Sequence, residues 1–317
     1  MVRLKNMIYT VTLNPAVDRE YIVPRLTPNT VLRATEVNID FGGKGFNVSR
    51  MLHLLSIEST ALGFLGGKAG QILEQGLTSI GIKTDFVHVA EETRTNTTIV
   101  EKEGRDHYKV NQSGAFVTQR ELDQFFRKVT TLINKDDWWI LAGSLPPGVP
   151  NGTYQQLIQL IQSGGAKAVL DTSGKALSLG INASPFLIKP NIFEAQMLTG
   201  ITNKSMKAMI EMINLIHAKG VPLVSISAGK DFSLFSTGRK VWKAVPPDIQ
   251  EANPIGAGDA MLAGMIYGLS TGFSDQESFA WGIAAGSATA ANPGTRMPAI
   301  IEVRKLLEKV KIDQIQC

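Results

Sequence analysis

The sequence predicts an α/β fold in which a mostly parallel sheet is sandwiched by helices and carries a small β-sheet lid. Short β-branched or aliphatic runs alternate with helix-like stretches along most of the 317 residues. Most of the apolar runs stop at loops rich in glycine, proline or polar residues. Two segments lack helical patterns and interrupt the alternation. Strand–helix alternation is typical of a parallel sheet with helices on both faces, and the two interruptions indicate an inserted second sheet.

The first expected strand covers residues 8–13, a short β-branched run broken by Asn14 and Pro15. A helix over residues 46–55 follows a glycine-rich turn. Four more apolar runs predict strands at residues 138–142, 168–171, 186–190 and 223–227. Helical patterns occupy residues 154–162, 192–198, 205–219 and 261–269.

Residues 21–40 and 95–110 depart from this alternation and resemble antiparallel strands with little helix between them. Residues 103–106, Glu-Gly-Arg-Asp, favour a hairpin turn within the second segment. No internal repeat or proline-rich linker occurs. We therefore expect a β lid made of residues 15–40 and 93–114, inserted into a nucleotide- and substrate-binding core made of residues 7–14, 41–92 and 115–317.

Composition excludes several classes of protein. Hydrophobic residues make up 44% and charged residues 19% of the chain, which excludes a disordered or collagen-like protein. The net charge of +4 comes without a dense basic block, so we expect no nucleic-acid partner. No long apolar stretch follows the first residues, so neither a signal peptide nor a membrane span is expected. The single cysteine, Cys317, fits a reducing, cytoplasmic compartment.

Common nucleotide, metal and hydrolase motifs are absent from the sequence. None of the four Gly-Lys pairs is followed by the Ser or Thr that a P-loop requires. Gly256 and Gly258 begin a dinucleotide-binding pattern, but Met261 replaces its third glycine. The four histidines lack the spacing of zinc ligands, and no G-x-S-x-G elbow occurs.

The strongest chemical signal precedes the helix expected over residues 261–269. Gly256, Ala257 and Gly258 leave backbone N–H groups bare at the positive end of that helix, which makes an anion site. Such donors stabilise charge on a transferring phosphoryl group. Asp259 beside them is suited to take a proton from a hydroxyl that attacks phosphorus. The alternative is an ordinary helix start with an aspartate favoured by the helix dipole.

A second glycine-rich segment precedes the helix expected over residues 46–55. Gly42, Gly43 and Gly45 allow the backbone to lie against a ligand. Lys44 and Asn47 offer polar groups at the helix opening. The alternative is a flexible hairpin followed by a capped helix, and the segment by itself favours neither.

Three further segments place polar groups where ligands bind to parallel sheets, or at the lid edge. Asp18 has two oxygens for sugar hydroxyls, and its alternative is an Asx turn. Arg94 has the planar fork that clamps a phosphate, and its alternative is a solvated charge. Lys189 suits the phosphates of a nucleotide. Asn191 and Glu194 suit Mg²⁺ held through water, or they cap a helix.

Four of these five segments follow apolar strands, so we expect them at one sheet edge. Together they resemble the ribokinase-like (PfkB-type) carbohydrate kinases, from about residue 8 to the C-terminal region. Residues 253–260 and 41–47 are similar to that family's two glycine signatures. Similarity to its 1-phosphofructokinase and tagatose-6-phosphate kinase branch extends over residues 10–18, 42–45, 93–96, 143–148, 171–174 and 189–194.

The resemblance implies a ribokinase-like fold and a role for each segment. Asp259 would be the catalytic base, with the backbone of Gly256, Ala257 and Gly258 as the anion hole. The sugar phosphate would be held by Asp18, Gly42, Gly43, Lys44, Asn47, Arg94 and Ser144. ATP or its Mg²⁺ would face Lys189, Asn191, Glu194, Ser227, Gly229, Gly256, Gly258 and Asn292, with Glu194 holding the metal through water.

Two residues depart from the family's pattern. The nucleotide turn Ser-x-Gly-x-x-Gly begins at Ser227 but ends in Phe232 instead of glycine. Pro254 stands before Gly-Ala-Gly-Asp where Ser or Thr is usual, a feature similar to tagatose-6-phosphate kinases.

The expected reaction is ATP-dependent phosphorylation of a ketohexose monophosphate. Residues 93–96 and 42–45, in the expected sugar site, favour fructose 1-phosphate as substrate and fructose 1,6-bisphosphate as product. Tagatose 6-phosphate, favoured by Pro254, and fructose 6-phosphate are alternatives. A rival from another class is a catalytically silent sugar-phosphate sensor, although Asp259 and its glycines are intact. The resemblance also implies a homodimer formed through the lid.

Overall fold

The main sheet of the protein is mixed, with a long parallel part and an antiparallel end. The computed structural model describes residues 6–102, 106–292 and 297–315. The strand order is β15-β14-β13-β12-β11-β10-β9-β1-β4-β5, and β6 also pairs with β4. All pairings from β12 to β5 are parallel, and those from β12 to β15 are antiparallel. The strands are β1 (Ile8–Thr12), β4 (Thr60–Leu65), β5 (Lys83–Thr84), β6 (Val87–His88), β9 (Trp138–Ala142), β10 (Lys167–Asp171), β11 (Leu187–Ile188), β12 (Leu223–Ser227), β13 (Ser233–Ser236), β14 (Val241–Val245) and β15 (Lys311–Ile315).

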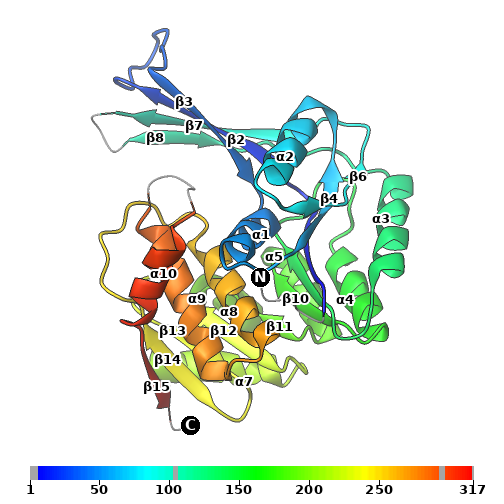
Figure 1. The fold of residues 1–317 in the computed structure, drawn as a ribbon, viewed down its shortest axis with the longest axis vertical. Helices are drawn as coiled ribbons and strands as arrows, with labels where there is room; N and C mark the ends of the chain where they lie inside the picture. Colours follow the sequence, from blue (N-terminus) through cyan, green and yellow to red (C-terminus); the bar gives the residue numbers. More distant parts are fainter. Residues whose placement is uncertain (1–5, 103–105, 293–296, 316–317) are drawn as a thin grey trace.

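Helices cover both faces of this sheet, as the sequence predicts (Figure 1). One face packs against α1 (Lys44–Leu54), α2 (Gly67–Ser79), α8 (Ala257–Thr271), α9 (Asp275–Ala290) and α10 (Ile300–Leu307). The other packs against α3 (Gln119–Leu132), α4 (Thr153–Ser163), α5 (Gly174–Gly180), α6 (Ile192–Thr199) and α7 (Met206–His217), with a short 3-10 turn at Ile181–Ala183. No helix within the described ranges is long and apolar enough to cross a membrane.

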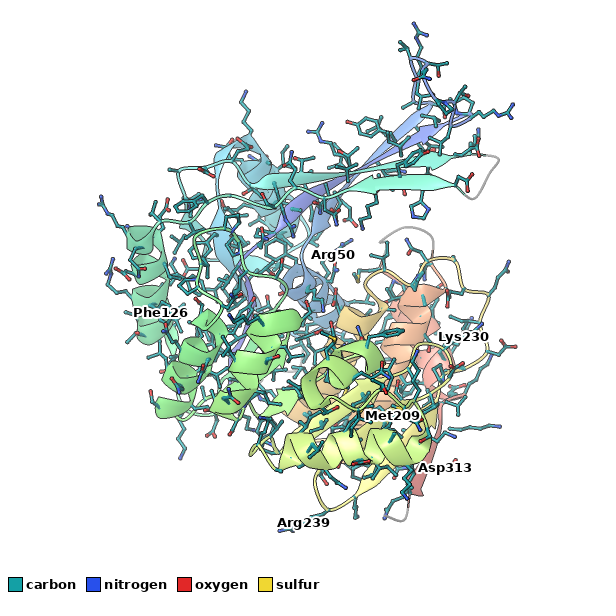
Figure 2. The ribbon with its side chains drawn as sticks, turned by 180° about the vertical axis from the view of Figure 1, so that it is seen from behind. Arg50, Phe126, Met209, Lys230, Arg239 and Asp313 are labelled. Atoms are coloured by element: carbon teal, nitrogen blue, oxygen red, sulfur yellow. The ribbon has the colours of Figure 1, made fainter. Side chains whose placement is uncertain are left out.

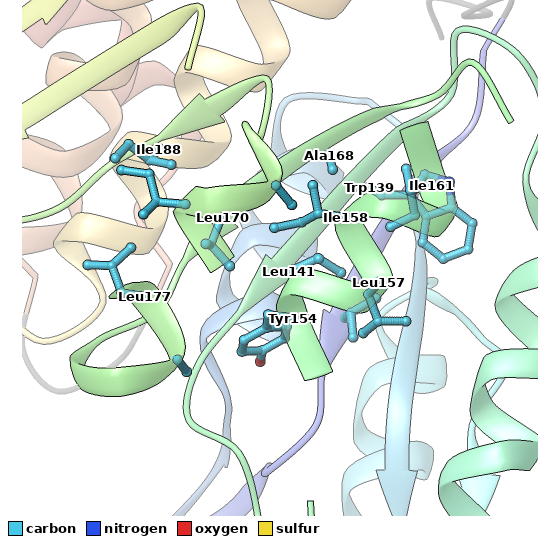
Figure 3. Packing of buried hydrophobic residues seen from close by; sticks show 14 of the residues in the cluster. Trp139, Leu141, Tyr154, Leu157, Ile158, Ile161, Ala168, Leu170, Leu177 and Ile188 are labelled. Carbon is cyan, nitrogen blue, oxygen red and sulfur yellow. The ribbon is translucent and has the colours of Figure 1, made fainter. Parts of the chain in front are cut away.

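The central strands are apolar on both sides because both of their faces are covered. In β9, Trp139 and Leu141 point to the helices α3 to α7, where α4 packs on them through Tyr154 and Leu157 (Figure 3). Trp138 in the same strand points to the opposite cluster, among residues of α1, α8 and α9. The uninterrupted apolar run of residues 138–142 therefore forms a fully buried strand with the bounds that the sequence predicts.

A separate four-stranded sheet reaches out from the body (Figures 1 and 2). Its order is β3-β2-β7-β8, from β2 (Ala16–Val23), β3 (Glu36–Gly42), β7 (Arg94–Glu101) and β8 (His107–Val110). The sequence predicts antiparallel strands here, and that is correct for β2–β3 and β7–β8 but wrong for the central pair, because β2 and β7 run parallel. Both strands leave the core side by side, with Ala16 opposite Arg94. The expected hairpin turn at 103–106 lies mostly outside the described residues.

Several elements were not predicted from the sequence, among them β4, α2, α3, α9 and the antiparallel strands β13 to β15. The antiparallel strands β13, β14 and β15 are short, and β13 is half serine. The helices α3 and α9 each begin with a capping box, Thr118 with Glu121 and Ser274 with Glu277. That Ser/Thr-x-x-Glu spacing is the signal that locates both helices in the sequence.

Candidate active site

Polar residues from five strands meet at the carboxyl edge of the parallel sheet. Asn14 follows β1, Ser144 follows β9, Asp171 ends β10, Lys189 follows β11 and Ser227 ends β12. The N-termini of α1 and α8 open at the same edge, since Asn47 of α1 bonds to Asp259 of α8. This is the place where α/β sheets bind ligands. The structure thus brings together the strand-end segments that the sequence predicts at one edge.

Asp259 is the buried carboxylate at the centre of this edge. It lies in the first turn of α8, with 7% of its surface exposed, and its Oδ2 accepts a hydrogen bond from Asn47 Nδ2 at 2.9 Å. Burial, followed by the charge of Asp171, raises the pKa of Asp259 to about 6, against the opposing influence of Lys44, Asn47 and Lys189. A carboxylate with this pKa is ionised near neutral pH and remains able to accept a proton.

Asp171 holds two lysines that come from different parts of the fold. Lys44 Nζ lies 2.9 Å from Asp171 Oδ1, and Lys189 Nζ lies 3.5 Å from Asp171 Oδ2. Burial would raise the pKa of Asp171, but Lys189 and Lys44 hold it below its usual range. Burial would lower the pKa of Lys44, but Asp171 and Asp259 hold it above the usual lysine range. Lys44 is therefore charged.

The first turn of α8 lies beside these side chains and is the kind of helix start that binds anions. Gly256 has a left-handed backbone with φ of 80° and serves as the N-cap, with no side chain bonded to the helix N-terminus. A Cβ at Gly258 would lie 3.4 Å from Lys189 Nζ, and one at Gly256 would lie 3.6 Å from Asn47 Nδ2. The backbone of Gly256, Ala257 and Gly258, the segment that the sequence analysis singles out, therefore lies close to Lys189 and Asp259.

Asp18 lies on the four-stranded sheet, beside the glycine-rich segment. Its Oδ1 accepts a hydrogen bond from Asn96 Nδ2 at 2.8 Å. A Cβ at Gly42 would lie 2.2 Å from Asp18 Oδ2, so only glycine leaves room for this carboxylate. Burial raises the pKa of Asp18, while Asn96 and Lys109 oppose the shift. Gly43 follows, with its backbone against Thr12, immediately before α1.

The Arg94 side chain is held by backbone carbonyls at the base of the four-stranded sheet. Its guanidinium donates to the carbonyl oxygens of Asn14 at 2.8 Å, Gln112 at 3.0 Å and Pro15 at 3.3 Å. Arg94 also lines a hollow of about 420 Å³. The alternative interpretation of the sequence, in which Arg94 is an ordinary solvated charge, does not fit these three contacts. Ser144 lies nearby, where its Oγ accepts from Asn14 Nδ2 at 3.3 Å.

A larger cavity of about 600 Å³ opens on the other side of the α8 N-terminus. Ser227, Gly229 and Gly258 line it, together with Pro254 and Lys230, and Figure 2 labels Lys230. Asn292 is not among the residues that line it, because its side chain donates to the Ala288 carbonyl oxygen. Phe232 is also outside the lining, and its ring lies 5.3 Å from Lys243 Nζ. The substitution of phenylalanine for glycine therefore places no side chain in the cavity.

Asn191 and Glu194 form the capping box of α6. Asn191 Oδ1 accepts from the Glu194 N–H and Glu194 Oε2 accepts from the Asn191 N–H, both at 2.9 Å. Across the described part of the chain, no three His, Cys, Asp or Glu side chains gather to hold a metal ion. Mg²⁺ in kinases is typically held by one or two carboxylates and by substrate phosphates. Glu194 at this edge fits an ion that arrives with a nucleotide.

Sequence reasoning missed two residues of this arrangement. In the sequence, Asp171 is only one residue of a stretch similar to a family branch, yet in the structure it joins Lys44 to Lys189. Asn96 likewise has no role assigned from the sequence, yet it fixes Asp18. The signal for Asp171 is its position, a carboxylate directly after the apolar run of residues 168–170. Asn96 has no comparable signal, because its partner lies on a neighbouring strand.

Known proteins resemble this chain over nearly its whole length. The sequence profile of the pfkB family of carbohydrate kinases matches residues 5–301. A 1-phosphofructokinase of Borreliella burgdorferi is 35% identical, over 98% of this chain and 99% of its own length. A tagatose-6-phosphate kinase of Staphylococcus epidermidis is 31% identical, over 86% of this chain and 88% of its own length. The structure of phosphofructokinase-2 from Escherichia coli, in complex with potassium, has a TM-score of 0.91 and 29% identity, over 96% of this chain and 99% of its own.

Proposed function

The chain belongs to the PfkB family of carbohydrate kinases, and we propose that it transfers the γ-phosphoryl group of ATP to fructose 1-phosphate. The observation that carries this proposal is Asp259, a buried carboxylate in the first turn of α8 with a pKa of about 6. The 600 Å³ cavity lies on one side of that turn, and the glycine-rich segment with Asn47 lies on the other. Nucleotide and sugar would thus approach Asp259 from opposite sides.

In the proposed mechanism, Asp259 accepts the proton of the sugar hydroxyl as its oxygen attacks the γ-phosphorus. The bond from phosphorus to the β–γ bridging oxygen breaks, and ADP leaves with that oxygen. The N–H groups at Gly256 to Gly258 and the Lys189 ammonium stabilise charge on the transferred group. Asn47 orients the Asp259 carboxylate through the 2.9 Å hydrogen bond. Mg²⁺, held through water by Glu194, would neutralise charge on the ATP phosphates.

The sugar phosphate would lie between Asp259 and the base of the four-stranded sheet. Asp18, fixed by Asn96, would accept hydrogen bonds from sugar hydroxyls. Arg94, fixed by three carbonyls, would bind the phosphate already on the sugar. Ser144 lies beside Asn14, one of the residues that hold Arg94. We propose the four-stranded sheet as a lid that excludes water from this space.

The activity is tested by ADP release coupled to an indicator enzyme, with ATP and a panel of phosphorylated and free sugars. Turnover of a ketohexose monophosphate supports the proposal. Binding of sugar phosphates without ADP release from any of them would instead identify a sensor.

Both substrates are metabolites of the cell interior, which supports a cytoplasmic location.

Replacing Arg94 by alanine should raise the KM for the sugar phosphate by roughly ten- to a hundredfold and leave the KM for ATP unchanged. A hydrogen bond to a charged group contributes ~1.5–3 kcal/mol. Arg94→Lys keeps the charge but not the fork, so an intermediate KM is expected. Melting temperatures of both variants monitor the loss of the three carbonyl contacts. A raised KM for ATP would assign Arg94 to the nucleotide side.

We propose that the outer face of the lid pairs two copies of the chain. Strand register places Val37, Ile39, Tyr108 and Val110 on one face, in line with Tyr21, Ile99, Arg19 and Thr97. The first four are each at least half exposed. An apolar face of this kind is suited to an interface. Asp18 and Asn96 lie on the opposite face, so pairing leaves the sugar site open.

Sedimentation velocity should therefore find a dimer for the wild type and a monomer for the double variant Ile39→Lys, Val110→Lys. Each copy would then place two unpaired ammonium groups in the interface, and burying them would be costly. Met197→Lys is the control, because Met197 is 83% exposed on α6, outside the lid. A monomeric wild type, or a double variant that remains dimeric, would refute pairing through this face.

A further inference from the structure

Asp259 and the three charged side chains around it form a compact group with a definite arrangement. Lys44 comes from α1, Asp171 from β10, Lys189 from the end of β11 and Asp259 from α8. Asp171 is 2% exposed and Lys189 is 4% exposed. The two ammonium groups balance the two carboxylates, so the group as a whole is neutral. Nothing in the mechanism above assigns Asp171 a contact with either substrate.

We infer that Asp171 is a positioning residue, whose buried carboxylate holds the Lys44 and Lys189 ammonium groups beside Asp259 and the first turn of α8. This inference rests on the proposed kinase reaction. The contacts carry it: 2.9 Å to Lys44 and 3.5 Å to Lys189, one to each carboxylate oxygen. Since the Lys189 ammonium also borders Gly258, Asp171 fixes the cation nearest the anion site.

The same carboxylate has an electrostatic effect on the catalytic base. The charged groups that face Asp259 are Asp171 from β10, Lys44 from α1 and Lys189 from β11, and Asn47 donates a hydrogen bond. The charge of Glu194 from α6 helps to raise the pKa of Lys44. Removing the Asp171 charge takes away a repulsion and frees both lysines to move toward Asp259. Asp171 thus keeps the lysines from pairing with the base that must accept a proton.

Asp171→Asn is the direct test, because it keeps the shape and removes the charge. In the wild type, kcat/KM for the sugar should fall as the pH drops through about 6, because protonated Asp259 accepts no further proton. In Asp171→Asn, kcat at pH 7.5 should fall at least tenfold. The acid limb of the pH profile, which is the fall in kcat/KM at low pH, should move to lower pH, because a neutral side chain no longer raises the pKa of Asp259. An unmoved acid limb would overturn the inference.

Two companion variants separate positioning from folding. Asp137→Asn also removes a buried carboxylate, one that accepts N–H groups of Met7 and Asn134 at the amino end of β9. It should lower the melting temperature and leave the acid limb in place. Asp171→Glu keeps the charge but displaces it, so kcat should fall while the acid limb stays near that of the wild type. If the acid limb of Asp171→Glu moved to lower pH as far as that of Asp171→Asn, the inference would be refuted.

Magnesium titration distinguishes positioning from metal binding. If Asp171 acts on the lysines, raising the Mg²⁺ concentration should not restore kcat in Asp171→Asn. Recovery at high Mg²⁺ would mean that Asp171 acts on the metal, and it would overturn the inference. A wild-type chain inactive with every sugar phosphate would instead refute the proposed function, so the two failures are distinguishable.

Discussion

Asp259→Asn should lower kcat by ~10²–10⁴-fold and change the KM for the sugar phosphate little. The range is that of a positioned base in proton transfer. Asparagine has nearly the same shape, so it preserves the packing of α8 but accepts no proton from the sugar hydroxyl. The neutral amide also removes the carboxylate that lies among Lys44, Lys189 and Asp171. The loss should therefore appear in the chemical step rather than in sugar binding.

Steady-state kinetics over a range of both substrates provides the measurement, and the dissociation constant for the sugar phosphate provides a check independent of turnover. Asp275→Asn is the matched control, because Asp275 stands in the first turn of the neighbouring helix α9. That variant should keep wild-type turnover. If Asp259→Asn retained near wild-type kcat, Asp259 would not be the base.

The sequence was sufficient to predict five strands of the parallel part, β1 and β9 to β12, because each is a short apolar run with a distinct end; it did not predict β4, β5 and β6. Residues 138–142 and 223–227 form strands with the predicted bounds. The parallel pairing of β2 with β7 was not predictable from local pattern, since it depends on where both strands leave the core. The antiparallel strands β13 to β15 are short and carry serine, lysine or other polar residues, so their local signal in the sequence is weak.

Individual site residues were predicted where local chemistry marks them. Asp259 follows glycines at a helix start, and the capping pair Asn191 and Glu194 has a fixed spacing. Contacts between distant residues have no local mark. Asn47 lies 212 positions from Asp259, and Lys44 lies 127 positions from Asp171. Only the fold brings these pairs together, so the role of Asp171 becomes visible only in the structure.

Fructose 1-phosphate should be the best substrate, with a kcat/KM roughly ten- to a hundredfold above that of free fructose. A charged hydrogen bond from Arg94 to the phosphate, at ~1.5–3 kcal/mol, accounts for this range. The resemblance also places Lys44 at the sugar phosphate; because its ammonium is paired with Asp171 in the structure, we propose Arg94 as the main cation for this phosphate. The discrimination should therefore largely disappear in Arg94→Ala.

The choice between sugars depends on where two sequence signals lie. Asn96, from the run that favours fructose 1-phosphate, bonds to Asp18 on the side proposed for the sugar. Pro254, the residue that favours tagatose 6-phosphate, lines the 600 Å³ cavity on the side proposed for ATP. A residue on the nucleotide side has little means to select the sugar, so the first signal carries more weight. A higher kcat/KM for tagatose 6-phosphate or fructose 6-phosphate would change the sugar and keep the mechanism. A higher value for free fructose would contradict the phosphate-binding role of Arg94 as well.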